Sequence, residues 1–520
     1  MLTMRSALER AQRLFGANTA IIDKERQFTW SEHMDRVMRL AHVLQENGIG
    51  KGDRFGIVCR NTWRHCELLH AGYWNGSVPV PVNYRLAPPE IRYILDDAGV
   101  TQLFVEDAFL PFLDADEFAP WRDGAICIPG GGVTDTTLRI SDDLIAAAAP
   151  SDGNDSTEEE DAILLYTGGT TGRSKGVRLT HKNVFSNGQQ CTAPMKINAA
   201  DIYLHVAPMF HSADLLGTGY TQAGAAHAYL PVFTPDNLLD AFQDYRVTSA
   251  MMAPTMIILT LQVPDFANYD LSSLDRVYYG SSPMAVEWIR RTMDAFPAAN
   301  VQQGYGLTET SPILTTLDED VHVAAMQSGE YEILKAAGRP LVGIDMRIVD
   351  ADGTEVPLGE GGEVVVRGPN VTVGYLNRPE ENATAFRDGW FHTGDIGKMG
   401  ENGFMFLLDR KKDMIVTGGE NVYSSEVEAA LYQHENVHEC AVVGVPDDKY
   451  GEALFAAIVP RPGTSLTDSE IIEHCRDLIG GYKIPRRMAF VDELPKSAMG
   501  KILKTEIRKI VIVKERETTI

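Results

Sequence analysis

The spacing of hydrophobic and polar residues along residues 1–110 predicts helices that alternate with strands. Apolar residues after Thr29 recur at helical spacing, and Glu32 completes a capping box with Thr29 at the start of that helix. Buried strands are predicted at 54–59, 78–82 and 102–105, and helices at 63–74 and 88–97. This alternation favours α/β layers with a mainly parallel sheet.

The pattern changes twice further along the chain. From Met346 short β runs are split by Asp-Gly and Gly-Gly turns, which predict hairpins. After Asp409 helices and strands alternate over roughly 110 residues, the size of a compact α+β domain. We therefore expect an α/β protein with a large multi-layer N-terminal domain of mixed sheets at 1–408 and a small C-terminal α+β domain at 413–520, with the boundary at 409–412.

Composition and charge narrow the function classes. The 520 residues are 44% apolar and 23% charged, as in globular proteins of more than one domain. The net charge of −25 argues against general binding of nucleic acid or anionic membranes, because phosphate groups repel an acidic surface. Six cysteines without a C-x-x-C pair predict reduced thiols and a cytoplasmic location. No apolar run is long enough to form an integral membrane segment.

The strongest chemical feature is the glycine- and threonine-rich segment 166–176, YTGGTTGRSKG, which directly follows a predicted strand. Glycines let backbone N–H groups converge on an anion, threonine hydroxyls add donors, and Lys175 adds a positive charge. The segment is not a Walker A loop, because Ser174 rather than glycine precedes the lysine and Gly176 follows it. The alternative interpretation is a flexible surface loop, which this hydroxyl and lysine content makes the weaker one.

Residues 166–176 resemble the phosphate loop of the adenylate-forming enzymes, which include acyl-CoA synthetases, luciferases and peptide-synthetase adenylation domains. Four later segments resemble further motifs of the family and occur in the same order as in the family. The first 150 residues also resemble the amino-terminal region of an acyl-CoA synthetase, so the resemblance covers essentially the whole chain. Those segments are 304–310 (GYGLTET), 389–395 (GWFHTGD), 409–413 (DRKKD) and 495–501 (PKSAMGK). Gly168 stands where most members carry Ser, and Ser174 where most carry Pro, so the strength of individual contacts is open.

The resemblance implies that ATP, Mg²⁺ and coenzyme A are used. Tyr305 would stack on adenine, with the Gln303 amide at the adenine edge and Gly304 and Gly306 beside the nucleotide. Thr308 would contact the α-phosphate, and Glu309 would ligate Mg²⁺, a hard cation that prefers oxygen ligands. The residues that would hold the phosphates are Thr167, Gly168, Gly169, Thr170, Thr171, Gly172 and Lys175.

Other positions follow from the same resemblance. Asp395 would accept hydrogen bonds from the ribose hydroxyls, and Arg410 would donate to the same sugar. Ser281 and Ser282 would line the adenine and acyl pockets. His211 matches a position beside the incoming carboxylate, although a lone histidine is as often structural.

Lys501 is the expected catalytic cation, because carboxylate attack on a phosphate brings two anions together. In the family the small domain is mobile and rotates after adenylation. Lys412 would be the pivot, and the face that carries Gly418 and Gly419 would turn towards a thiol channel.

The resemblance implies an ATP-dependent acid–CoA ligase that forms acyl-AMP and pyrophosphate, and then acyl-CoA and AMP. A monocarboxylic fatty or aryl acid is expected, since no lysine or arginine stands among the candidate pocket residues to pair a second carboxylate. The expected partners are the acid, ATP and CoA, and a homodimer is one option. Three alternatives stay open: an enzyme that loads the pantetheine of a carrier protein, a non-catalytic nucleotide sensor, and a luciferase-type oxygenase, which would require a special substrate.

Overall fold

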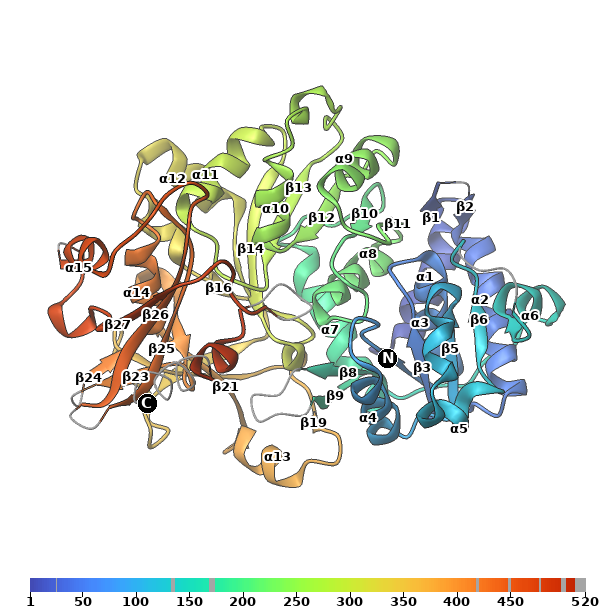
Figure 1. The fold of residues 1–520 in the computed structure, drawn as a ribbon. Coiled ribbons are helices and arrows are strands. Elements are labelled where there is room, and N and C mark those ends of the chain that lie inside the picture. The colour runs from blue at the N-terminus through green and yellow to red at the C-terminus, as the bar shows by residue number, and fades with distance from the viewer. Residues whose placement is uncertain are drawn as a thin grey trace. The chain divides into compact units, whose positions relative to one another are not determined.

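The chain divides into two compact units in the computed structural model (Figure 1). The first unit comprises Met1–Met346 and Val366–Phe391, and the second comprises Arg347–Val365 and His392–Ile520. The predicted boundary at 409–412 lies inside the second unit and stays a prediction. The structure describes residues 1–24, 26–131, 136–167, 174–417, 420–447, 450–476, 478–496 and 502–509.

The largest sheet of the first unit has nine strands and a mainly parallel centre. Its parallel core runs from β14 through β13, β12 and β10 to β11 and β1, and antiparallel strands close both edges. In spatial order the strands are β16 (Arg339–Pro340), β15 (Ile313–Leu317), β14 (Asn300–Gly306), β13 (Arg276–Gly280), β12 (Ser249–Met252), β10 (Ile202–His205), β11 (Ala226–Tyr229), β1 (Thr19–Asp23) and β2 (Arg26–Thr29).

A second sheet holds the strands predicted near the N-terminus, and all of its pairings are parallel. The capping box at Thr29 forms as predicted and starts helix α2 (Trp30–Glu46). The strand order is β4 (Val78–Pro81), β3 (Arg54–Val58), β5 (Gln102–Glu106), β6 (Ile126–Ile128) and β7 (Arg139–Ile140). The predicted mixed α/β fold is confirmed.

Helices surround these sheets in the first unit. Pro88 and Pro89 begin α4, where a proline is tolerated because the first turn has no N–H partners to lose. Besides α2, the helices are α1 (Met4–Phe15), α3 (Trp63–Asn75), α4 (Pro88–Ala98), α5 (Ala119–Arg122), α6 (Ser141–Ala147), α7 (His181–Thr192), α8 (Gly217–Ala223), α9 (Pro235–Asp244), α10 (Pro254–Thr260), α11 (Val286–Ala295), α12 (Glu319–Ser328) and α13 (Pro379–Ala385).

A small antiparallel sheet completes the first unit and carries the glycine-rich segment. Its order is β19 (Gly374–Tyr375), β9 (Lys175–Thr180) and β8 (Asp161–Thr167). The central strand therefore has a neighbour that comes about two hundred residues later in the chain. This pairing brings 372–381 to the segment that follows the predicted phosphate loop.

The second unit contains the predicted α+β elements. The helices α14 and α15 alternate with strands, as predicted, and β25 and β26 form a long antiparallel pair that β27 extends in parallel. The bounds are β23 (Ile415–Thr417), β24 (Glu420–Val422), α14 (Ser424–Leu431), β25 (Val437–Asp447), β26 (Gly451–Pro460), α15 (Asp468–Arg476) and β27 (Arg487–Phe490).

One further sheet is formed by strands between Asp345 and Arg410. Its path runs β17, β18, β21 and β20, and β22 pairs with β21. The bounds are β17 (Asp345–Val349), β18 (Gly361–Arg367), β20 (Phe386–Arg387), β21 (Trp390–Met399) and β22 (Met405–Arg410). Among the described residues, no helix has both the length and the apolar character needed to cross a membrane.

Several histidines are buried in the first unit and hydrogen-bond to one another. His33 Nε2 lies 2.8 Å from His70 Nδ1, and His205 Nε2 lies 2.9 Å from His227 Nδ1. The Asp214 carboxylate lies 2.6 Å from His205 Nδ1. Burial lowers the pKa of His70 to about 3, so this imidazole stays neutral in the folded protein at neutral pH.

Acid should therefore destabilise the protein before its carboxylates titrate. Burial lowers the pKa of His65 to about 4, while an unfolded histidine titrates near 6.5. Between these values the unfolded chain binds more protons, so the free energy of unfolding falls as pH falls, by about 1.4 kcal/mol per pH unit for each such histidine. Chemical denaturation at pH 7, 6 and 5 should show this dependence of the free energy of unfolding on pH. His65→Gln should make the dependence weaker by the contribution of one histidine. An unchanged slope in that variant would contradict the assignment.

Candidate functional site

The predicted phosphate loop connects the two strands of a β-hairpin. The last residue pair of this hairpin joins Thr167 on β8 to Lys175 on β9. A loop closed this way starts and ends at one place, which suits a segment that must wrap around an anion. Five of the predicted loop residues lie outside the described part of the chain: Gly168, Gly169, Thr170, Thr171 and Gly172.

Lys175 lies among side chains that the sequence analysis did not connect with it. Its Nζ is 3.8 Å from Glu381 Oε1 and 5.4 Å from the ring centre of Tyr375. The aromatic face favours a nearby cation, and the carboxylate balances its charge. Glu381 lies on α13 and Tyr375 on β19, so pairing of β19 with β9 assembles this group.

The strands β13 and β14 run parallel and present their carboxyl ends side by side. Gly280 and Gly304 are paired across these strands, and a Cβ at Gly280 would collide with the carbonyl oxygen of Gly304. A Cβ at Gly306 would collide with the carbonyl oxygen of Pro312. Close backbone contacts at the ends of these strands therefore require glycine at Gly280 and at Gly306, one of the two glycines predicted beside the nucleotide.

The two predicted serines follow β13. Ser281 and Ser282 are both exposed, and Ser281 has a φ of 67°, in the left-handed region. A non-glycine residue in this region carries a backbone cost, and such positions cluster at functional sites. On the next strand, Tyr305 is buried, and Gln303 accepts a hydrogen bond at its Oε1 from the Tyr279 hydroxyl at 3.4 Å.

Thr308 is held by a residue from another segment. Its hydroxyl lies 2.9 Å from the Ser212 hydroxyl, and both residues are buried. Ser212 begins the short 3₁₀ helix η3 (Ser212–Leu216), which His211 caps by accepting a hydrogen bond from the Ala213 N–H at 3.2 Å. His211 thus has a structural role here, next to the residue that holds Thr308.

The Glu309 carboxylate, predicted to ligate Mg²⁺, is half-buried and partly engaged. Its Oε1 accepts a hydrogen bond from the Tyr375 hydroxyl at 2.8 Å, and its backbone carbonyl accepts one from the Thr372 N–H at 2.8 Å. The described part of the chain contains no group of three or more His, Cys, Asp or Glu side chains that could hold a metal ion. One carboxylate fits Mg²⁺ that arrives with ATP, because this ion takes most of its ligands from phosphates and water.

The predicted ribose residues lie in the second unit and contact each other. Asp395 and Arg410 are paired across β21 and β22, and Arg410 Nε lies 2.7 Å from Asp395 Oδ1. The Asp395 side chain is 5% exposed and that of Arg410 is 38% exposed. Lys412 follows in the turn after β22 and is exposed. The remaining predicted residues of this unit, Gly418, Gly419 and Lys501, lie outside the described residues.

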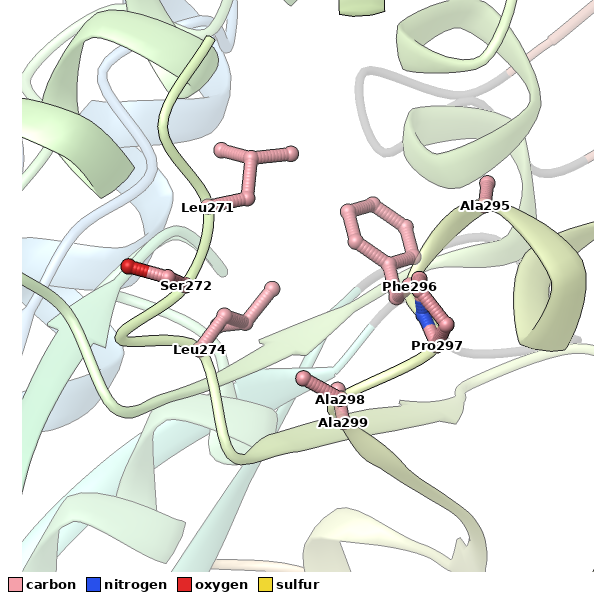
Figure 2. Close-up of a pocket in the computed structure, with 8 residues that line it drawn as sticks. All are labelled: Leu271, Ser272, Leu274, Ala295, Phe296, Pro297, Ala298 and Ala299. Carbon is pink, nitrogen blue, oxygen red and sulfur yellow. The ribbon is translucent and has the colours of Figure 1, made fainter.

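A cavity of about 310 Å³ lies elsewhere in the first unit (Figure 2). Leu271 and Leu274 on one side and Phe296 on the other line it, in the segments just before β13 and β14. It therefore lies at the amino ends of these strands. Ligands of parallel α/β sheets bind at the carboxyl ends, where the predicted site residues lie, so this cavity is separate from the candidate site.

Comparison with protein families identifies the family to which the chain belongs. Residues 8–376 match the family described as AMP-binding enzyme, and residues 426–501 match the AMP-binding enzyme C-terminal domain. This chain belongs to the AMP-binding enzyme family. The resemblance inferred from the five sequence segments is thereby confirmed.

Named relatives and solved structures are similar to this AMP-binding enzyme over nearly its whole length. A feruloyl-CoA synthase from Amycolatopsis sp is 35% identical over 493 residues, which cover 94% of this chain and 95% of that protein. The fatty acid–[acyl-carrier-protein] ligase ScoC from Streptomyces coeruleorubidus is 32% identical, covering 94% and 92%. The structure of the anthranilate CoA ligase AuaEII in complex with anthranoyl-AMP is 26% identical, with a TM-score of 0.86 and coverage of 98% and 97%.

Sequence reasoning missed three residues that contact the predicted site of this AMP-binding enzyme. Tyr375 holds Glu309, Glu381 faces Lys175, and Ser212 holds Thr308. Each lies far along the chain from its partner, and no local pattern marks it. A signal was present only for Ser212, which directly follows the predicted residue His211.

Proposed function

We propose that this chain is an ATP-dependent acid–CoA ligase that acts on a monocarboxylic fatty or aryl acid. The main support is the group formed by Lys175, Tyr375 and Glu309, in which a cation and a carboxylate lie beside one phenol at the end of the phosphate-loop hairpin. A triphosphate with its magnesium ion needs both kinds of group. Family membership and relatives that make CoA thioesters support the same assignment.

The reaction would proceed in two steps on one site. A carboxylate oxygen forms a bond to the α-phosphorus of ATP, the bond from that phosphorus to the bridging oxygen breaks, and pyrophosphate leaves. The CoA sulfur then bonds to the acyl carbon, the bond to the phosphate oxygen breaks, AMP leaves, and the thiol proton passes to solvent. The first step turns a poor electrophile into a mixed anhydride, which the thiol can attack.

We assign the nucleotide contacts as the resemblance implies. Thr167 and Lys175 would hold the phosphates, Thr308 the α-phosphate, and Asp395 and Arg410 the ribose. Glu309 would bind the Mg²⁺ that comes with ATP, and this ion supplies charge neutralisation of the phosphates. A cytoplasmic location and a homodimeric state remain predictions from the sequence.

Tyr375→Phe should weaken the use of MgATP. The substitution removes the hydroxyl that holds Glu309 Oε1, and a hydrogen bond to a charged group contributes about 1.5 kcal/mol, or roughly tenfold. We expect the KM for MgATP and the Mg²⁺ concentration for half-maximal rate to rise about tenfold, with the KM for the acid unchanged. Steady-state pyrophosphate release measures all three.

Tyr220→Phe is the matched control for this prediction. It removes the hydroxyl that lies 3.1 Å from the Tyr278 hydroxyl in the core, and it leaves Glu309 untouched. The control should keep the wild-type KM for MgATP. Equal changes in both variants would mean that Tyr375 only supports the fold.

The acceptor of the acyl group distinguishes the main proposal from its alternative. ScoC, whose name gives an acyl-carrier protein as acceptor, is nearly as similar to this chain as the feruloyl-CoA synthase is. We favour free CoA because both the feruloyl-CoA synthase and the anthranilate CoA ligase use it by name. The alternative is an enzyme that transfers the same acyl-AMP to the pantetheine of a carrier protein.

The test is a panel of fatty and aryl acids in a pyrophosphate-release assay, followed by thioester detection with free CoA or with a holo-carrier protein. The proposal expects acid-dependent pyrophosphate release and a thioester with free CoA. A thioester formed only on the carrier protein would favour the alternative, and no acid-dependent pyrophosphate would favour a non-catalytic sensor.

A further inference from the structure

Helix α4 lies beside the phosphate-loop hairpin and contacts β9 (Figure 1). Tyr93 and Asp97 lie four residues apart on α4, so they share one face of the helix. The Tyr166 hydroxyl, from the strand that enters the loop, donates to Asp97 Oδ2 at 2.8 Å. The Tyr93 hydroxyl donates to the carbonyl oxygen of Ser174, at the end that leaves the loop, at 3.2 Å.

Arg378 joins these two contacts into one group. Its Nη2 donates to Asp97 Oδ1 at 2.9 Å and also to the Tyr93 hydroxyl. Both carboxylate oxygens of Asp97 are therefore engaged, one by Tyr166 and one by Arg378. We name Tyr93, Asp97, Tyr166 and Arg378 the neck clamp.

The backbone around the neck clamp is held as well. Tyr166 is paired with Gly176 across the hairpin, and a Cβ at Gly176 would lie 3.0 Å from Cζ of Tyr166, so the phenol ring lies over this glycine. The Leu376 N–H donates to the Gly176 carbonyl oxygen at 2.8 Å, and the Asn377 side chain donates to the Asp97 carbonyl oxygen at 3.3 Å.

Burial makes the charged pair of the neck clamp stronger than a surface ion pair. The Asp97 side chain is 11% exposed and that of Arg378 is 21% exposed, so solvent screens their attraction only in part. Leaving either charge without its partner would be costly at such a site. The clamp therefore holds the chain on each side of the loop, at Tyr166 and at Ser174.

We propose that Asp97 is a positioning residue: through Tyr166 and Arg378 it holds the two ends of the phosphate-loop hairpin, where Thr167 and Lys175 lie, and so determines how much more tightly the protein binds ATP than AMP. This inference rests on the proposed function, in which the loop holds the ATP phosphates. ATP and AMP share adenine, ribose and the α-phosphate, and only ATP carries the β- and γ-phosphates. Displacing Thr167 and Lys175 from the phosphates should therefore weaken ATP binding and spare AMP binding.

The test is isothermal titration of the full-length protein with MgATP and with AMP, for Asp97→Asn and for the control Asp96→Asn. Asp96 is the neighbouring residue on α4, and its carboxylate pairs with Arg92 at 2.6 Å on the helix surface. We expect Asp97→Asn to weaken MgATP binding about tenfold, which is about 1.4 kcal/mol, with AMP binding unchanged. The control should bind both nucleotides as the wild type does.

Tyr166→Phe is the second variant, because it keeps the Asp97–Arg378 pair and removes only one hydroxyl. It should also weaken MgATP binding selectively, by a smaller factor than Asp97→Asn does. If Asp97→Asn has a melting temperature well below that of the wild type, Tyr166→Phe is the variant that tests the proposal. Equal loss of ATP and AMP binding, or unchanged ATP binding in both variants, would overturn the proposal. A wild-type protein that binds ATP no more tightly than AMP would overturn it too.

Failure of the proposed function would look different. A wild-type protein that makes no acyl-CoA or carrier thioester contradicts the ligase assignment. The titrations use neither acid nor thiol, so they still decide whether the neck clamp controls ATP binding.

Discussion

Replacing Lys501 with alanine should slow adenylation by about 10²–10³-fold, because a preorganised cation that stabilises transition-state charge contributes about 2.7–4 kcal/mol. Its ammonium would act only while the carboxylate and ATP react. In the thioester-forming step the small domain would have rotated, so the lysine would be absent. Synthetic acyl-AMP and CoA bypass the first step, and the variant should convert them to acyl-CoA at close to the wild-type rate.

The control is Lys509→Ala, which removes an exposed lysine whose partner is Glu506, at 2.7 Å. It should leave both steps unchanged, as surface substitutions usually change stability by less than about 0.5 kcal/mol. If Lys501→Ala hardly alters adenylation, the lysine is a surface residue. If it slows both steps equally, the lysine supports the fold or both conformations rather than adenylation alone.

Replacing Lys412 with proline should have the opposite effect: adenylation should be kept and thioester formation should be lost. Lys412 lies in the turn after β22, where the Asp413 N–H donates to the Arg410 carbonyl oxygen at 2.8 Å. Proline fixes φ near −65°, so a pivot at this position would lose the freedom to rotate. We expect acyl-AMP formation at close to the wild-type rate and at least about a 100-fold loss in conversion of acyl-AMP to acyl-CoA, or about 2.7 kcal/mol.

Lys412→Ala is the control that separates backbone freedom from the side chain. It removes the same ammonium and leaves φ free, so the thioester-forming step should stay close to the wild type. A loss of that step in the alanine variant would assign the effect to the side chain. A parallel loss of both half-reactions in the proline variant, with a lower melting temperature, would place the pivot elsewhere.

Local patterns were enough to predict the elements whose residues interact with near neighbours. The capping box at Thr29 uses residues three positions apart, and it forms as expected. The strands β3, β4 and β5 are short, apolar and flanked by helices, so their burial could be recognised from sequence alone. The family segments indicated the chemistry for the same reason, since each is a continuous run of residues.

Contacts between distant segments could not be predicted in this way. Tyr375 meets Glu309 only because β19 adds to the edge of β9, and a two-residue strand carries almost no pattern of its own. In the sequence, Asp97 is not distinguished from other charged residues near the end of a helix. In the structure its carboxylate hydrogen-bonds to both Tyr166 and Arg378. Such partners are chosen by tertiary pairing rather than by local spacing.

A single-turnover experiment tests the central claim most directly. Enzyme, MgATP and an accepted acid are mixed without CoA, quenched, and analysed for acyl-AMP and pyrophosphate, and a parallel sample is chased with CoA. We predict one pyrophosphate per acyl-AMP, formation that depends on the acid, and conversion of that acyl-AMP to an equal amount of acyl-CoA and AMP after the chase. Formation of ADP and phosphate, or acyl-CoA without prior acyl-AMP, would contradict the assignment.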